Sequence, residues 1–119
     1  MRLTDAEWSV LEALWTNDRL SLGEIYDILK IKNGWSKTTV HTYLKRMAAK
    51  SLVGIDNDSK KPYCALISRE NCAVQERRDL LERVYNGAAG DMIAAFLKDS
   101  KISSKEVERL KKLLDDMEV

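Results

Sequence analysis

The chain has 119 residues, enough for one domain or two small ones, and an ordinary globular composition with 45% hydrophobic and 33% charged residues. The net charge is only +1, yet residues 32–61 carry seven lysines and arginines against two aspartates. A local basic segment favours a polyanionic partner, although a solvated surface gives the same count. No apolar run is long enough to cross a membrane, and the N-terminus lacks the apolar core of a signal peptide, so we expect a cytoplasmic location without membrane insertion.

Two cysteines and one histidine limit the possible metal chemistry. Cys64 and Cys72 form no Cys-x-x-Cys pair, and His41 has no second ligand at metal-binding spacing. A disulfide between the cysteines is not expected in a reducing compartment. The sequence has no Gly-rich phosphate loop and no recognisable pair of catalytic carboxylates. We therefore predict no metal, no cofactor and no enzymatic activity.

Two capping boxes predict the first two helices. Thr4 and Glu7 have the spacing at which a hydroxyl and a carboxylate satisfy each other's backbone N–H groups, which predicts a helix over residues 5–16. Ser21 and Glu24 have the same spacing and predict a second, shorter helix.

The third predicted helix carries the residues of greatest interest. Asn33-Gly34 ends the second helix, and Ser36 then caps the third, with Trp35 and Val40 placed as the two ends of a hydrophobic staple. One face is apolar: Val40, Leu44 and Met47. Polar and basic side chains that suit bases and phosphates gather at its start and along its outer face: Ser36, Lys37, Thr38, His41, Thr42, Lys45 and Arg46. Each of these residues is also ordinary on a solvated helix, so the prediction rests on their assembly.

A β hairpin is predicted after the third helix. Residues 52–56 and 63–67 have strand character, and the turn-rich loop between them contains Lys60 and Lys61, which are expected to contact the DNA backbone. Leu20 is a candidate for a one-residue strand. Three helices followed by a hairpin with a basic loop have the order of a winged helix-turn-helix domain.

Three further helices with thin apolar stripes are predicted after residue 68. They cover residues 75–85, residues 88–98, and a segment opened by a third capping box at Ser103 and Glu106. About fifty residues of this kind form a poor independent core, so we expect a second copy to cover them, with folding back onto the winged domain as the alternative. The residues expected at the dimer contact are Val74, Leu81, Val84, Val107, Leu110, Leu114 and Met117.

The predicted fold class is therefore mainly α with a small β hairpin. A winged helix-turn-helix DNA-binding domain is expected at residues 1–68, and a three-helix dimerisation domain at residues 69–119.

Three segments resemble the penicillinase repressor family of BlaI, MecI and CopY type. They are LTDAEWSVLEALW at 3–15, WSKTTVHTYLKRM at 35–47 and SSKEVERLKKLLDD at 103–116, and the resemblance covers nearly the whole chain in order. It implies a homodimer that represses transcription from palindromic double-stranded operator DNA rich in TACA and TGTA half-sites.

The chain departs from this family's pattern in two places. The copper-responsive branch has a pair of Cys-x-Cys motifs near its C-terminus, and their absence here disfavours copper sensing. The resemblance implies a repressor of the β-lactam-resistance type. For that type the resemblance implies a membrane sensor protease system as a partner and inactivation of the repressor by a cut at an Asn-Phe bond. The corresponding position here is Ala95-Phe96, so the Asn is replaced, and Phe96 is equally explained as a core residue.

The predicted function is thus a sequence-specific DNA-binding repressor. The alternative is a winged-helix protein-interaction module without DNA binding, since this fold also serves in such assemblies. An interaction module would more often show apolar residues in place of the basic outer face.

Overall fold

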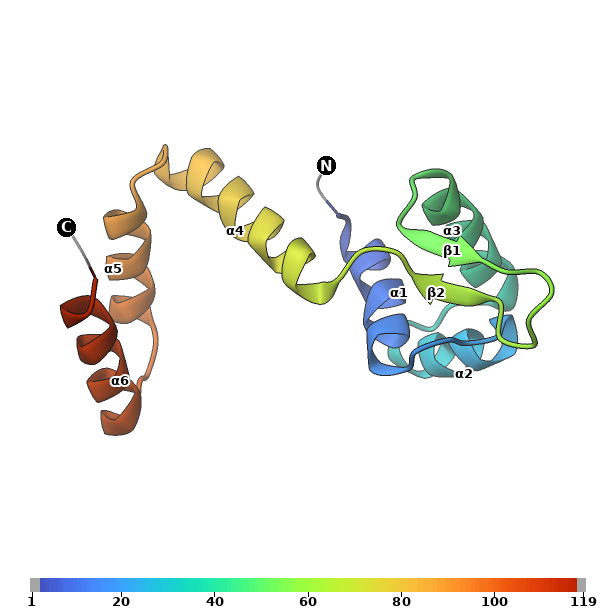
Figure 1. Cartoon of the computed structure of the whole chain (residues 1–119), viewed down its shortest axis with the longest axis horizontal. Coiled ribbons are helices and arrows are strands. Elements are labelled where there is room, and N and C mark those ends of the chain that lie inside the picture. The colour runs from blue at the N-terminus through green and yellow to red at the C-terminus, as the bar shows by residue number, and fades with distance from the viewer. Residues whose placement is uncertain (1–2, 118–119) are drawn as a thin grey trace. The chain divides into compact units, whose positions relative to one another are not determined.

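The computed structural model describes residues 3–117, in which six helices accompany one two-stranded antiparallel sheet (Figure 1). The elements in chain order are α1 (Asp5–Thr16), α2 (Leu22–Lys32), α3 (Lys37–Ala49), β1 (Val53–Ile55), β2 (Tyr63–Ala65), α4 (Arg69–Tyr85), α5 (Ala89–Asp99) and α6 (Ser104–Asp115). This order confirms the predicted fold class. No helix within residues 3–117 has the length and apolar character needed to cross a bilayer.

The chain divides into two compact units, Met1–Arg78 and Asp79–Val119, and the division falls inside α4. The sequence predicted that this helix begins at residue 75, but it begins at Arg69. Ser68 explains the earlier start, because its hydroxyl accepts the Asn71 N–H at 3.1 Å and so caps the first turn.

The core of the first unit joins α1, α2 and α3 to the hairpin. Its fully buried side chains come from one face of each helix and from the strands, as the apolar periodicity predicted. They include Val10, Leu11, Leu14, Ile25, Leu29, Val40, Leu44, Met47 and Val53.

Both predicted capping boxes at the start of the chain are confirmed. Thr4 Oγ1 accepts the Glu7 N–H at 3.2 Å, and Glu7 Oε1 accepts the Thr4 N–H at 3.0 Å. The Ser21 and Glu24 pair makes the same two bonds at 3.2 and 3.0 Å. At the start of α6 only the forward half of the predicted box forms in the described chain, where the Ser103 hydroxyl accepts the backbone N–H three residues on at 3.2 Å.

The hairpin is shorter than predicted, with three residues in each strand and Gly54 opposite Cys64. Leu20 extends it from outside, because its N–H and carbonyl both bond to the backbone of Tyr63 at 3.0 Å. The predicted one-residue strand is therefore confirmed, and it ties the turn between α1 and α2 to the base of the wing.

A left-handed residue sets the path from α3 into the wing. Ser51 has φ of +61°, and its N–H bonds to the carbonyl of Ala48 at 3.0 Å, while Leu52 N–H bonds to that of Met47 at 2.9 Å. These two bonds form a Schellman motif, and the buried side chains of Leu52 and Met47 supply its hydrophobic contact. The turn thus ends α3 and brings β1 back onto the core.

A polar and aromatic cluster fixes the first turn of α4 on α1, within the first unit. Arg69 makes two hydrogen bonds of 2.7 Å to the two carboxylate oxygens of Glu12. Its guanidinium lies 5.0 Å from the ring centre of Trp15, whose Nε1 donates to the Ile67 carbonyl at 2.8 Å. The Arg69 hydrogen bond holds the pKa of Glu12 below its usual range.

Candidate nucleic-acid interface

Helix α3 is held by its cap and its apolar face, which leaves the opposite face to solvent. Ser36 Oγ accepts the Thr39 N–H at 3.2 Å, and the apolar residues Val40, Leu44 and Met47 are fully buried. Trp35 lies just before the Ser36 cap and stacks on Tyr43 of α3, with ring centres 4.7 Å apart and planes 10° apart. This packing fixes how α3 is rotated about its axis, and therefore which residues face outward.

The structure exposes almost all of the residues that the sequence suggested for DNA contact. Thr42 is partly buried and the other eight are exposed: Ser36, Lys37, Thr38, His41, Lys45, Arg46, Lys60 and Lys61. On α3, Lys37, Lys45 and Arg46 form no ion pair with any residue of the described chain. Three cations on one helix are thus left without an intramolecular counter-charge.

Thr42 has a more limited chemistry than its position suggests. Its hydroxyl donates to the Thr38 carbonyl at 2.9 Å, one turn earlier in α3. The hydroxyl proton is therefore engaged within the helix, and the side chain offers its oxygen lone pairs and its methyl group to a partner.

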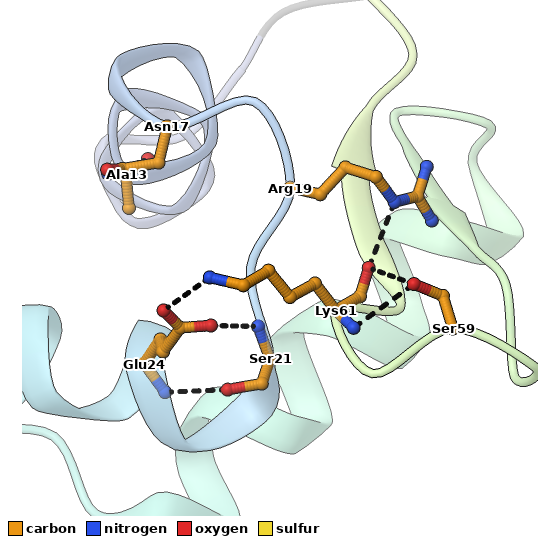
Figure 2. Close-up of polar contacts among 7 residues, drawn as sticks. All are labelled: Ala13, Asn17, Arg19, Ser21, Glu24, Ser59 and Lys61. Atoms are coloured by element: carbon orange, nitrogen blue, oxygen red, sulfur yellow. Dashed lines mark hydrogen bonds and ion pairs between the residues drawn. The ribbon is translucent and has the colours of Figure 1, made fainter.

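The two wing lysines lie in different environments. Lys60 is exposed and has no ion-pair partner among residues 3–117, whereas Lys61 Nζ lies 3.0 Å from Glu24 Oε2 in the first turn of α2 (Figure 2). The hydrogen bond from the Ser21 backbone and the one from Lys61 together hold the pKa of Glu24 below its usual range. The wing therefore has one unpaired lysine and one that is already paired.

Arg19 makes contacts to the wing that sequence reasoning missed. Its Nε donates to the Lys61 carbonyl at 2.9 Å, and a terminal nitrogen of its guanidinium donates to the Pro62 carbonyl at 3.0 Å. In the sequence Arg19 is only a polar residue in a turn, and its partners lie about forty residues later, so no local pattern signals the contact.

A further lysine at the end of α3 is committed to the fold. Lys50 Nζ lies 2.9 Å from Glu7 Oε2, and Glu7 is only 4% exposed. Burial alone would raise the pKa of Glu7, but the Thr4 N–H together with the hydrogen bond and charge of Lys50 outweighs burial and lowers it. Within residues 3–117, the cations of α3 and the wing that have no ion-pair partner are therefore Lys37, Lys45, Arg46 and Lys60.

The second unit leaves many of its apolar side chains exposed or only partly buried. Neither α5 nor α6 buries a residue. The predicted dimer residues are either exposed (Val84, Val107, Leu114, Met117) or partly buried (Val74, Leu81, Leu110), and Val74 lies in the first unit. Phe96 is 52% exposed and Ala95 partly buried, both inside α5.

The remaining reactive groups form no metal or redox centre within the described residues. Cys64 and Cys72 are both free thiols, and no cluster of three potential metal ligands occurs in residues 3–117. Burial raises the pKa of the Cys72 thiol, which suits a packing role at the start of α4.

The sequence of the chain is similar to those of known transcriptional repressors. The family described as penicillinase repressor matches residues 3–116. The methicillin resistance regulatory protein MecI of Staphylococcus aureus N315 is 23% identical over 95% of this chain and 93% of its own length. The penicillinase repressor of Bacillus licheniformis is 24% identical over 97% of this chain and 91% of its own length.

A solved structure shares the fold. It is the solution structure of monomeric BlaI from Bacillus licheniformis in complex with the blaP half-operator, and it matches with a TM-score of 0.53 and 22% identity. The match covers 60% of this chain and 88% of that one.

The fold and the uncovered cations of α3 define a winged-helix DNA-binding regulator. Because the family match spans nearly the whole chain, this protein belongs to the penicillinase repressor family. It is a DNA-binding transcriptional repressor and not an enzyme, and the alternative of an interaction module without DNA binding is set aside.

Proposed function

We propose that the chain works as a homodimer in the cytoplasm, with the winged unit of each copy on one half-site of a palindromic operator. Its DNA-binding residues are those predicted on α3 and in the wing. Residues 1–68 serve DNA binding and residues 69–119 serve dimerisation. The first turns of α4 also belong to the winged unit through the Glu12–Arg69 contact.

One observation carries the DNA-binding part of this proposal. Lys45 and Arg46 project from a helix whose opposite face is fully buried, and neither has an ion-pair partner within the described chain. Exposed cations without counter-charges bind phosphate at no expense of existing contacts, and the release of condensed counterions from DNA drives the association. The free N–H groups at the start of α3 favour phosphate as well.

The dimer part is supported by the second unit. Val107 and Leu114 lie exposed on α6, and Met117 lies exposed just after its end. Short helices with exposed apolar stripes need a partner surface. A second copy of the same unit offers the same stripes, which suits a symmetric, self-complementary interface.

We propose that repression is released by proteolysis. We place the chain in the β-lactam-resistance type, with a membrane sensor protease system as a partner and a cut at Ala95-Phe96. This bond lies inside α5, so a protease would need local opening of that helix. Intact-mass measurement on the chain from induced cells tests the site of cleavage.

DNA binding is tested by replacing the two cations. We expect Lys45→Ala with Arg46→Ala to weaken binding to all duplexes and to lower the slope of log affinity against log salt by about two, because about one counterion is released per phosphate contact. Thr42→Ala should mainly change discrimination among operators. The measurement is fluorescence anisotropy on a palindromic duplex with TACA and TGTA half-sites at several salt concentrations.

The matched control replaces two exposed cations in the second unit, Lys98→Ala with Lys101→Ala. It changes the net charge equally but leaves α3 intact, and its salt slope should match that of the unaltered protein. Equal titration curves for the Lys45/Arg46 variant and the unaltered protein would remove α3 from the DNA contact.

A further inference from the structure

The Glu24 carboxylate uses each of its oxygens for a different task. Oε1 accepts the Ser21 N–H at 3.0 Å as part of the capping box, and Oε2 accepts the Lys61 ammonium at 3.0 Å (Figure 2). The first task belongs to α2 alone. The position of the carboxylate is therefore set by the start of α2 and does not depend on the wing.

The backbone of Lys61 is held independently of its side chain. Its carbonyl accepts from Arg19 Nε at 2.9 Å, and its N–H donates to Ser59 Oγ at 3.1 Å (Figure 2). The neighbouring Pro62 carbonyl accepts a second bond from Arg19. The ammonium group can thus leave Glu24 while the wing keeps its place.

The Glu24–Lys61 pair lies in a depression that other charged side chains also line. Arg19, Glu24, Lys60 and Lys61 line one depression between the first turn of α2 and the wing. Asp18 lines the same depression, so its charged groups are two carboxylates and three cations. A phosphate that approaches Lys60 would therefore come close to both Lys61 and its present partner.

The solvent exposure of the Glu24–Lys61 pair decides whether Lys61 can exchange Glu24 for another anion. The side chains of Glu24 and Lys61 are 42% and 55% exposed, so solvent screens their attraction and the pair contributes little to stability. Glu7 and Lys50 repeat the same arrangement of cap and lysine, but Glu7 is buried, so that pair is a fixed part of the fold.

We propose that Glu24 holds Lys61 in reserve, and that a DNA phosphate replaces the Glu24 carboxylate as the partner of Lys61 when the wing meets DNA. The inference rests on the proposed function, and it adds Glu24 and Arg19 as residues that control wing affinity without contacting DNA. Lys60 supplies the standing wing contact. Lys61 adds its contact only where a phosphate competes successfully with Glu24, so the pair lowers affinity for weakly bound DNA.

The test is a double-mutant cycle on Glu24 and Lys61. Glu24→Gln keeps an oxygen for the cap, since Gln serves in capping boxes, but it removes the charge that holds Lys61. We expect binding to tighten by about two- to five-fold, the range for an exposed ion pair. This gain should disappear in a Lys61→Gln background and persist in a Lys60→Gln background, which is the matched control.

Each outcome decides the matter. An equal gain from Glu24→Gln with and without Lys61 would mean that Glu24 only repels DNA at a distance, and no gain or a loss would mean that the pair is a permanent brace; both overturn the inference and leave the proposed function standing. Absence of DNA binding by the unaltered protein would overturn both.

A second comparison avoids any change at Glu24. Lys61→Gln should weaken binding less than Lys60→Gln does, because part of the Lys61 contact is offset by losing Glu24. The reverse order would contradict the inference. Thermal melting of every variant checks that it is folded.

Discussion

At the residue scale, two glutamates with the same local role differ in function because their burial differs. Glu7 and Glu24 each cap a helix and each pair with a distant lysine. Water is excluded from Glu7, so its charge must be matched by Lys50 and the Thr4 N–H. The Glu7–Lys50 pair therefore serves the fold, and the exposed Glu24–Lys61 pair remains exchangeable.

The Glu7 pair predicts how stability depends on pH. Because the pKa of Glu7 is lowered in the folded protein, its charged form contributes stability above its unfolded pKa, and this contribution is lost as the pH falls through the folded pKa. We expect Glu7→Gln to reduce the free energy of unfolding by about 1–2 kcal/mol near neutral pH, since a charged hydrogen bond becomes neutral. The difference from the unaltered protein should shrink as the pH falls toward about 3, well below the ordinary carboxylate pKa.

Urea unfolding at several pH values measures this difference. Asp58→Asn, in the exposed hairpin loop, is the control and should leave the pH dependence unchanged. A constant difference between Glu7→Gln and the unaltered protein across this range would show that the Glu7 charge is not what stabilises the fold.

At the element scale, local sequence signals predicted the helices whose ends are marked by capping residues in the sequence. The caps at Thr4, Ser21 and Ser36 and the apolar periodicity of α1 and α3 fixed these helices to within a residue or two, and with them the outward face of the candidate site. Such signals lie within a few residues of the structure they specify, so a single sequence contains them.

Contacts between distant residues were beyond the reach of the sequence. The start of α4 was missed because its first turns are charged, and because Cys72 and Arg69 find their places only against the folded first unit. The contacts of Arg19 and Lys61 were missed for the same reason, since both cross about forty residues of chain. These are tertiary contacts, and no local pattern encodes them.

The early start of α4 predicts which truncated chain is stable. A chain of residues 1–78 keeps Cys72, which is 2% exposed, together with the Arg69 contact to Glu12, whereas a chain of residues 1–67 loses both. The loss of the Cys72 burial alone should lower the free energy of unfolding by on the order of 1–2 kcal/mol. Chemical denaturation of the two chains measures the difference.

A third chain, residues 1–78 with Cys72→Ala, separates the side chain from the helix that carries it. It should fall between the other two. Equal stability for the chains ending at 67 and 78 would show that the first turns of α4 add nothing to the winged unit.

At the scale of the whole molecule, the two units leave different kinds of side chain without a partner within residues 3–117: cations in the first unit and apolar side chains in the second. The first unit buries a full core and leaves cations without counter-charges, whereas α5 and α6 bury no residue at all. The first therefore lacks an anionic partner and the second lacks an apolar one. In the proposed function, DNA and a second copy of the chain would supply them, and a dimer would join two weak half-site contacts into one tighter contact.

This arrangement predicts that affinity depends on the interface formed by α6. Leu114 is 59% exposed and Leu110 partly buried in the single chain, so replacing both with Ala should disturb the folded chain little and weaken association strongly. The unaltered protein should sediment as a dimer at micromolar concentration and bind a full palindrome about 100-fold or more tighter than a half-site duplex. The Leu110/Leu114 variant should sediment as a monomer, and its preference for the palindrome should disappear while its half-site affinity stays the same.

The control is Glu108→Ala with Lys111→Ala, a double substitution on the same helix that removes one exposed ion pair and leaves the net charge unaltered. A monomer for the unaltered protein, or a palindrome preference that survives in the Leu110/Leu114 variant, would contradict the dimer, because the second half-site adds affinity only when the two winged units are joined.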